Sequence, residues 1–247
     1  MQPATEHAVL LPARGQVQLH VLPEPAALAA AAAQRFSEWL SPDEYERWRR
    51  FHLEADRQRF LLARALVRSL LGAYVQQAPA SLQFTRSPYG KPELVQPAAT
   101  PEQTLKFNLS HTRGLLVLAV TAADEIGVDV ESITREAEML ALAERYFAAS
   151  EVAMLRAADP LQLHELFFRL WTLKEAYVKA RGLGLQLGLD SFAIGLGRNS
   201  TPALLHAADD DVARWSCFSI AHADVFRIAA AVSAPTASLQ LNEVHLF

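Results

Sequence analysis

Apolar and polar residues alternate in several short stretches of the chain, and each such stretch predicts a strand. In residues 16–21, Val17, Leu19 and Val21 fall on one side. Two short strands are expected on either side of the turn at residues 87–92. By the same criteria, further strands are predicted at 106–110, 115–121, 126–131, 191–194, 215–220 and 225–231.

Longer stretches repeat apolar residues every three or four positions, which predicts helices. One helix is expected over about residues 54–77, where Phe60, Val67, Leu70, Leu71 and Tyr74 share helical spacing. Another is expected over about residues 161–181, ending at Gly182. Shorter helices are predicted at about 136–147 and 150–157.

The segment Ser41-Pro42-Asp43-Glu44 predicts the start of a further helix. Ser41 can cap the helix, Pro42 suits its first position, and Glu44 completes a capping box. The alanine-rich run at residues 26–33 also predicts a helix of the folded protein. It is only eight residues long, whereas a membrane span needs about 20 apolar residues.

Each half of the chain thus runs from a strand through helices to several more strands. We therefore expect an α+β fold with an N-terminal half at 1–124 and a C-terminal half at 125–247. The pattern suggests a structural duplication, although no sequence repeat is obvious.

Composition narrows the class of protein. Hydrophobic residues make up 51% and charged residues 20% of the 247 residues, which argues against disorder. A net charge of −4 argues against a dedicated nucleic-acid binder. The lone cysteine, Cys217, cannot form an internal disulfide, and no basic-then-apolar leader is visible. We expect a soluble cytoplasmic protein.

The strongest chemical signal is a pair of carboxylates in the strand at 126–131. Asp129 and Glu131 project from one face of that strand, whereas Val128 and Val130 project from the other. Two neighbouring carboxylates repel each other unless water or a cation lies between them, and Mg²⁺ prefers such oxygen ligands. A solvated outer face of a strand gives the same pattern.

The second signal lies on the helix at 161–181. Glu175 and Lys179 are four residues apart and share a face, with Trp171 and other apolar residues around them. An ordinary ion pair on a helix surface has the same spacing.

Two further segments could hold phosphate. Ser110 and His111 end a predicted strand in a polar cluster, although a capped turn explains them equally well. Residues 44–68 hold seven arginines against four acids, and the planar arginine fork suits phosphate oxygens. Most of these arginines also fit solvated helix faces.

These segments occur together in an order that resembles a known family. The chain resembles the long, surfactin-synthetase-activating type of 4′-phosphopantetheinyl transferase over about residues 41–195. The resemblance is carried by Tyr89-Gly90-Lys91-Pro92, Phe107-Asn108-Leu109-Ser110-His111, Gly127-Val128-Asp129-Val130-Glu131 and Trp171 with Lys174-Glu175-Ala176 and Lys179.

The resemblance implies a fold and a reaction. Members have two similar halves related by a pseudo-twofold, each a small, mostly antiparallel sheet packed on a long helix, with coenzyme A between them. They transfer the phosphopantetheine of coenzyme A to a serine of an apo fatty-acid, polyketide or peptide carrier protein, releasing 3′,5′-ADP. A monomer suffices, and neither nucleic acid nor membrane is a partner.

The resemblance also implies roles for residues. Asp129 and Glu175, with Glu131 in many members, are expected to bind Mg²⁺. Glu175 is the expected base, acting directly or through a water, and Lys179 is expected to reach the pyrophosphate. The remaining coenzyme contacts are expected from Arg47, Arg86, Gly90, Lys91, Pro92, Asn108, Ser110 and His111.

The chain departs from some relatives at two positions. Glu44 and Phe60 stand where those relatives have Lys or Thr, which leaves the contacts to the 3′-phosphate open. A magnesium-dependent phosphohydrolase and a non-catalytic coenzyme A-binding relative remain as alternative functions.

Overall fold

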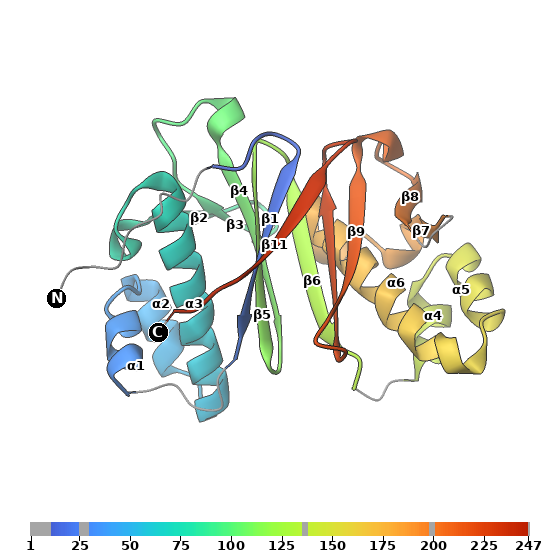
Figure 1. Cartoon of the computed structure of the whole chain (residues 1–247), viewed down its shortest axis with the longest axis horizontal. Coiled ribbons are helices and arrows are strands. Elements are labelled where there is room, and N and C mark those ends of the chain that lie inside the picture. The colour runs from blue at the N-terminus through green and yellow to red at the C-terminus, as the bar shows by residue number, and fades with distance from the viewer. Residues whose placement is uncertain (1–10, 25–29, 135–137, 198–200, 247) are drawn as a thin grey trace.

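Two sheets, each backed by a long helix, form the core of the protein (Figure 1). The computed structural model describes residues 11–24, 30–134, 138–197 and 201–246. Within them the helices are α1 (Ala30–Ser37), α2 (Pro42–Arg49), α3 (Glu54–Val75), α4 (Met139–Tyr146), α5 (Ala149–Arg156) and α6 (Pro160–Arg181). The α+β fold with two halves is confirmed.

The strands follow the predicted order, with two additions. They are β1 (Gln16–Pro23), β2 (Phe84–Arg86), β3 (Pro92–Leu94), β4 (Leu105–Thr112), β5 (Leu115–Ala122), β6 (Ile126–Ser132), β7 (Phe192–Leu196), β8 (Pro202–Ala207), β9 (Ser216–His222), β10 (Phe226–Val232) and β11 (Ser238–Glu243). Of these, β8 and β11 were not predicted. Both are largely exposed: β8 buries only Leu204, and in β11 only Leu239 and Leu241 alternate with polar residues, a pattern too short to stand out.

The first sheet has the order β11-β1-β5-β4 and packs against α3. Strand β5 is buried on both faces, which explains its continuous apolar sequence. Leu116, Leu118 and Val120 pack towards α3, whereas Leu115, Val117 and Ala119 pack towards the second sheet.

The second sheet has the order β6-β10-β9 and packs against α6. Gly127 allows this helix to approach β6 closely. A Cβ at this position would lie 2.0 Å from the carbonyl oxygen of Ala176 and 2.3 Å from the backbone nitrogen of Ala180. The close approach brings the β6 face that carries Asp129 directly against α6.

The inner faces of the two sheets form a shared core that includes Val128 and Val130. The molecule therefore has four layers, with α3 and α6 outside and the sheets between them (Figure 1). Strands β4 and β6 lie beside each other, and the Val128 amide donates to Asn108 Oδ1 at 2.9 Å.

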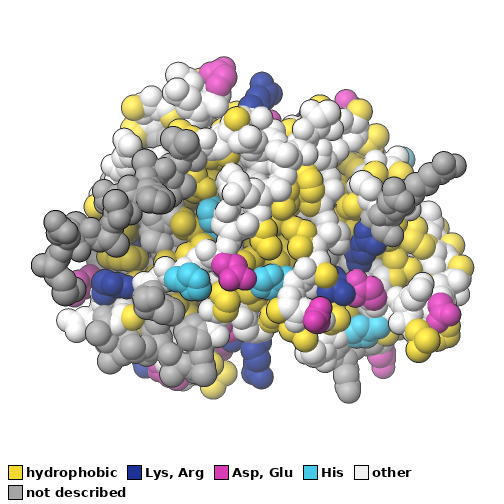
Figure 2. Space-filling model, in the orientation of Figure 1, with side chains coloured by type: hydrophobic (Ala, Val, Ile, Leu, Met, Phe, Trp, Pro, Cys, Tyr) yellow, Lys and Arg dark blue, Asp and Glu magenta, His cyan; other side chains and the backbone are white. Residues whose placement is uncertain are grey.

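On the face of the molecule shown in Figure 2, acidic and basic side chains are interspersed.

The predicted helix ends are confirmed. Ser41 Oγ accepts from the Glu44 amide while the Glu44 carboxylate accepts from the Ser41 amide, forming the expected capping box of α2. At the end of α6, Gly182 adopts a φ of +65°, a left-handed conformation that glycine tolerates best. Part of the predicted alanine-rich helix, residues 26–29, lies outside the described residues, and α1 begins at Ala30.

The last strand connects the end of the chain to its beginning. Sequence reasoning placed residues 125–247 in the C-terminal half, yet β11 pairs in parallel with β1 in the first sheet. Gln18 and Gln240 are register partners, and their side chains also bond at 3.1 Å. In the described part of the chain, we find no helix long and apolar enough to cross a membrane.

A buried histidine under α3 leads to a prediction about stability and pH. His20 is 6% exposed and its Nε2 lies 2.8 Å from the Tyr74 hydroxyl. Burial lowers the pKa of His20 from 6.5 to about 4. The unfolded chain therefore binds a proton at a higher pH than the folded protein. Acidification from pH 6.5 to 4 should lower the free energy of unfolding by about 3 kcal/mol through this residue.

Urea unfolding across this pH range measures the effect. His20→Gln should remove this part of the pH dependence, because glutamine does not titrate and can still bond to Tyr74. His52→Gln, at an exposed position, is the matched control and should leave the dependence intact. An unchanged profile in His20→Gln would contradict the assignment.

Candidate functional site

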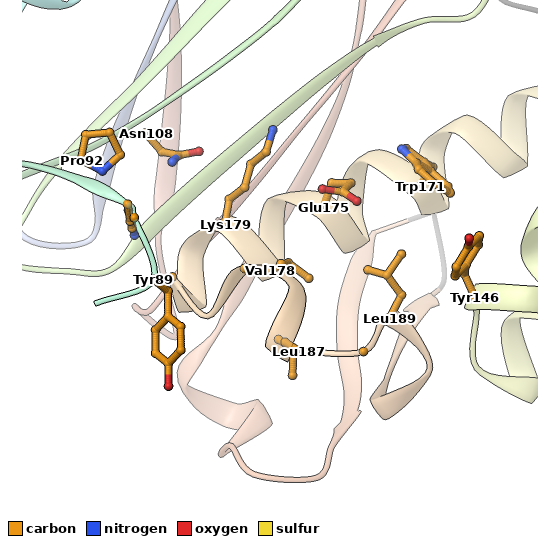
Figure 3. Close-up of a pocket in the computed structure, with 15 residues that line it drawn as sticks. Tyr89, Pro92, Asn108, Tyr146, Trp171, Glu175, Val178, Lys179, Leu187 and Leu189 are labelled. Atoms are coloured by element: carbon orange, nitrogen blue, oxygen red, sulfur yellow. The ribbon is translucent and has the colours of Figure 1, made fainter. Parts of the chain in front are cut away.

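A cleft of about 650 Å³ lies between the two halves. Its walls come from the turn at 89–92, Asn108 on β4, the end of α4, one face of α6 and the segment at 184–189. Figure 3 shows Trp171, Glu175 and Lys179 along α6, with Asn108 and Pro92 towards one end and Tyr146 towards the other.

Beside the cleft, the buried carboxylate of Asp129 holds Lys179, one of the two lysines of α6. Lys179 Nζ donates to Asp129 Oδ1 at 2.6 Å and to Ser110 Oγ at 3.0 Å. Ser110 Oγ also donates to Asp129 Oδ1 at 3.0 Å. Residues from β4, β6 and α6 therefore meet at one point, which places a cation at the cleft wall.

The negative charge on Asp129 Oδ2 and on the Glu175 carboxylate is not fully balanced by neighbouring groups. Asp129 Oδ2 is buried and has no hydrogen-bond partner among the described residues. Burial raises the pKa of Glu175, and the charge of Asp129 raises that pKa further, while Lys179 opposes the shift. A divalent cation beside both carboxylates would relieve their repulsion. These two side chains therefore fit a magnesium site.

Protein side chains alone do not complete that site. In the chain as described, no three His, Cys, Asp or Glu side chains are grouped so as to hold a metal ion. Mg²⁺ commonly takes one or two carboxylates, with waters and substrate phosphates supplying the other ligands. Glu131 lies two residues after Asp129 on β6 and is half-buried. Its role as a ligand stays a prediction.

The structure decides against the simpler interpretations of these motifs. Asp129 is 5% exposed and faces α6, so the solvated strand face is wrong for this residue. Lys179 pairs with Asp129, and so it is not merely half of a surface pair with Glu175. Ser110 lies within β4 and bonds to side chains, which rules out a simple capped turn.

The other two predicted site residues of β4, Asn108 and His111, line two different hollows. Asn108 lines the cleft, but its Oδ1 already accepts from the Val128 amide. Its amide nitrogen therefore remains as the group that can donate to a ligand. His111 lines a neighbouring hollow of about 270 Å³ together with Arg59.

The predicted turn Gly90-Lys91-Pro92 lines the cleft, but its lysine side chain is committed elsewhere. Lys91 Nζ donates to Glu125 at 3.1 Å, to the Ile126 carbonyl at 3.0 Å and to the Ala180 carbonyl at 3.1 Å. These acceptors lie at the start of β6 and near the end of α6. Lys91 therefore fastens the turn of the first half to the second half.

The predicted arginines lie on the other side of Pro92. Arg47 and Arg86 line a second hollow of about 560 Å³, which shares Pro92 with the cleft. Arg47 stacks on Phe60 at 5.5 Å from the ring centre, and Arg86 donates to the Gly90 carbonyl at 3.0 Å. The two are thus brought close to the turn but not into the cleft itself.

We expect Lys91→Met to lower the free energy of unfolding by about 1–3 kcal/mol, because it leaves buried acceptors without a donor. Lys106→Met is a matched control, since Lys106 also pairs with Glu125 at 3.1 Å but is more exposed. It should cost less than about 1 kcal/mol. Urea unfolding measures both, and equal effects would contradict the fastening role of Lys91.

Sequence reasoning missed several residues around these hollows. Tyr146, Leu187 and Leu189 line the cleft, and Arg64 lines the second hollow. Their local patterns resemble ordinary helix or loop sequence, so no motif distinguished them. For Arg64, the signal available was the unusual arginine content of residues 44–68.

Comparison with known proteins agrees with the motifs. A family model described as the 4′-phosphopantetheinyl transferase superfamily matches residues 125–231, and one described as 4′-phosphopantetheinyl transferase, N-terminal, matches residues 29–123. The chain is 37% identical over 194 residues to 4′-phosphopantetheinyl transferase HetI of Nostoc sp., covering 78% of each protein.

The chain is also similar to a second known sequence and to a solved structure. The chain is 34% identical over 163 residues to 4′-phosphopantetheinyl transferase Sfp of Bacillus subtilis, covering 66% of this chain and 69% of that protein. A holo-(acyl-carrier-protein) synthase structure from Bacillus anthracis, in complex with CoA (3′,5′-ADP), covers 44% of this chain and 93% of its own, at 22% identity and a TM-score of 0.38. The extent of the sequence matches to HetI and Sfp decides the family: the chain belongs to the 4′-phosphopantetheinyl transferases and is an enzyme.

Proposed function

We propose that the cleft binds coenzyme A with Mg²⁺ and transfers 4′-phosphopantetheine to a serine of an apo carrier protein, releasing 3′,5′-ADP. The observation that carries this proposal is the junction of Ser110, Asp129 and Lys179 at the cleft wall, with Glu175 on the same face of α6. This junction combines the fixed ammonium group of Lys179 with two carboxylates, Asp129 and Glu175, whose negative charges a metal ion would balance.

The two halves contribute different groups. Arg47, Arg86 and the turn at 89–92 come from the N-terminal half, which we assign to the adenosine and 3′-phosphate end of coenzyme A. Asp129, Glu175 and Lys179 come from the C-terminal half, which we assign to the metal and the reacting phosphate. Both walls belong to one chain, so a monomer suffices.

Mg²⁺, when bound by Asp129 and Glu175, supplies positive charge beside the pyrophosphate. Lys179 Nζ donates to phosphate oxygens and is held in place by Asp129 and Ser110. Asn108 and His111 lie on either side of Ser110 along β4 and donate to the phosphates. Charge that builds on the departing 3′,5′-ADP is thereby stabilised by groups fixed before the reaction.

Transfer needs the serine hydroxyl to lose its proton as oxygen attacks the phosphorus that bears pantetheine. The P–O bond to the departing 3′,5′-ADP breaks, and that group leaves with the bonding electron pair. Glu175 faces the cleft and is the residue that accepts the proton, directly or through a water. The apolar groups Trp171, Val178 and Leu189 line the cleft nearby and offer a surface for the pantetheine arm.

The test incubates the pure protein with coenzyme A, Mg²⁺ and several apo carrier proteins, and weighs the carriers intact. We expect the mass of phosphopantetheine to be added to at least one carrier and to be lost with a chelator. Release of free 4′-phosphopantetheine without any carrier would instead indicate a phosphohydrolase. Transfer that persists in chelator would overturn the metal assignment.

A further inference from the structure

Lys179 is bonded to the same carboxylate group that is expected to bind the metal ion. Its Nζ donates to Asp129 Oδ1 at 2.6 Å, and Ser110 Oγ donates to the same oxygen at 3.0 Å. Asp129 Oδ2 is buried and accepts no hydrogen bond from the described residues. A metal ion on Oδ2 would therefore share one carboxylate with the lysine ammonium. Since Asp129 is only 5% exposed, water screens the repulsion between two such cations poorly.

The backbone holds Lys179 and Asp129 close together. Lys179 lies on α6, and a Cβ on Gly127 of β6 would lie only 2.0 Å from the Ala176 carbonyl oxygen of that helix. The carbonyl of Ala180, the residue directly after Lys179, accepts from Lys91 Nζ at 3.1 Å. The helix is therefore fixed on both sides of the lysine. The ammonium group is a permanent neighbour of Asp129, and a metal ion has to bind in its presence.

The balance of charge at this junction is unfavourable for a metal ion alone. Glu175 lies one helical turn before Lys179 and lines the same cleft. Two carboxylates and one ammonium leave a single negative charge for a divalent ion. Glu131, a further carboxylate of β6, is the register partner of Arg227 on β10 and so has a cation beside it. A metal ion alone would therefore bring an excess of positive charge into a poorly solvated site.

A diphosphate supplies the negative charge that the junction lacks. Its oxygens are ligands that Mg²⁺ prefers. Lys179 has three N–H donors, of which two serve Ser110 and Asp129, and the third can donate to a phosphate oxygen. The lysine side chain is 29% exposed and lines the cleft, so a ligand in the cleft can reach it. With a diphosphate bound, the ammonium and the metal ion have a shared anion between them, which offsets their repulsion.

We propose that the ammonium group of Lys179 keeps the metal site of the free enzyme weak, so that the metal ion binds together with the diphosphate of coenzyme A and not before it. This inference rests on the proposed function. Lys179 strengthens the binding of phosphate and weakens the binding of metal. Removal of its charge should therefore change the two affinities in opposite directions, which a role in phosphate binding alone would not produce.

The test measures the binding of Mn²⁺, used in place of Mg²⁺ and detected by electron paramagnetic resonance, to the protein without coenzyme A. Lys179→Gln removes the charge but keeps a side chain that can donate to Asp129. We expect this variant to bind Mn²⁺ about 10- to 100-fold more tightly than the wild type. Lys179→Arg keeps the charge and should stay within about threefold of the wild type. At about pH 8, well above the ordinary pKa of a carboxyl group, protons compete little with the metal ion.

Two controls show where the Mn²⁺ ion binds. Lys106→Gln is the matched control, because the Lys106 side chain is 28% exposed, pairs with Glu125 and lines a different, smaller hollow. It should leave the affinity for Mn²⁺ within about twofold. Adding Glu175→Gln to the Lys179→Gln variant should abolish the tight binding, because the second carboxylate is then lost.

Coenzyme A without a carrier protein completes the test, since no transfer can occur. It should tighten the binding of Mn²⁺ to the wild type by at least about tenfold, and Mn²⁺ should tighten the binding of coenzyme A by the same factor. Calorimetry without metal should show that Lys179→Gln binds coenzyme A about tenfold more weakly than the wild type.

Three outcomes would overturn the proposal. They are equal affinity of free wild type and Lys179→Gln for Mn²⁺, tight binding that survives the added Glu175→Gln, and a wild-type affinity for Mn²⁺ that coenzyme A leaves unchanged. If the wild type transferred nothing to any carrier, the proposed function would fail. The Mn²⁺ affinities of the free proteins would still decide the effect of Lys179 on the metal site.

Discussion

Replacing Glu175 with glutamine is expected to lower kcat/KM for transfer by about 10³-fold. The carboxylate faces the cleft, and both burial and Asp129 raise its pKa. Glutamine keeps the shape but can neither accept a proton nor supply a charged oxygen to Mg²⁺. Initial rates with an apo carrier, followed by intact mass, measure the loss. Asp129→Ala should abolish transfer as well, because it frees Lys179.

The fold should survive Glu175→Gln, since neutralising this side chain removes its repulsion with Asp129. Glu165→Gln is the matched control, because Glu165 lies on the same helix, pairs with Arg227 and is 44% exposed. It should leave the rate within about twofold. A Glu175→Gln variant with the wild-type rate would show that the site is assigned wrongly.

The largest effect on stability is expected at the buried pair of Lys174 and Glu151. Both side chains are completely buried. Lys174 Nζ donates to the two Glu151 oxygens at 2.8 Å and 2.6 Å and to the Phe192 carbonyl at 2.9 Å. Lys174→Met alone should lower the free energy of unfolding by about 3–5 kcal/mol, because it leaves the buried Glu151 carboxylate without its ion-pair partner.

A double-mutant cycle tests the coupling. Burial lowers the pKa of Lys174, and Glu151 opposes this shift, so each charge depends on the other. The double variant Lys174→Met with Glu151→Gln should be more stable than Lys174→Met alone, because no unpaired charge remains. Urea unfolding of the four proteins measures this. A double variant that lost the sum of the two single effects would show that the pair is not coupled.

The same pair shows how the chemistry of α6 is supported. Glu151 also accepts from the Ile194 amide at 2.8 Å and the Ala148 amide at 2.9 Å. It therefore joins α5, α6 and β7 around Lys174, the residue directly before Glu175. On the face towards β6, Lys179 is fixed by Asp129. The helix is thus held on both sides of the cleft-facing Glu175.

The amino-acid sequence by itself determined most of the elements and several of their ends. The capping box at Ser41 and the stop at Gly182 are local signals, and both are found as predicted. Strand alternation correctly placed Val128 and Val130 in the core. Such features depend on residues within a few positions of one another, and so sequence periodicity reveals them.

Motif order also made the family recognisable, and the sequence matches to known proteins confirm it. The roles of individual site residues were a different matter. Sequence reasoning paired Glu175 with Lys179 by helical spacing, whereas the lysine bonds to Asp129, fifty residues away along the chain. It placed Lys91 in a ligand-binding turn, and that turn does line the cleft, but the amino group of Lys91 fastens the two halves.

Only the tertiary structure decided these partners, because they depend on which faces meet. Gly127 allows α6 to lie against β6, and that contact brings Lys179 to Asp129. Arg64 looks like any helix-surface arginine in the sequence, yet its Nε is buried in the folded protein. Strand β11 has almost no buried face, so only its pairing with β1 gives it a place in the fold. Local periodicity encodes which residues avoid water, but the partners of buried polar groups are set by long-range packing.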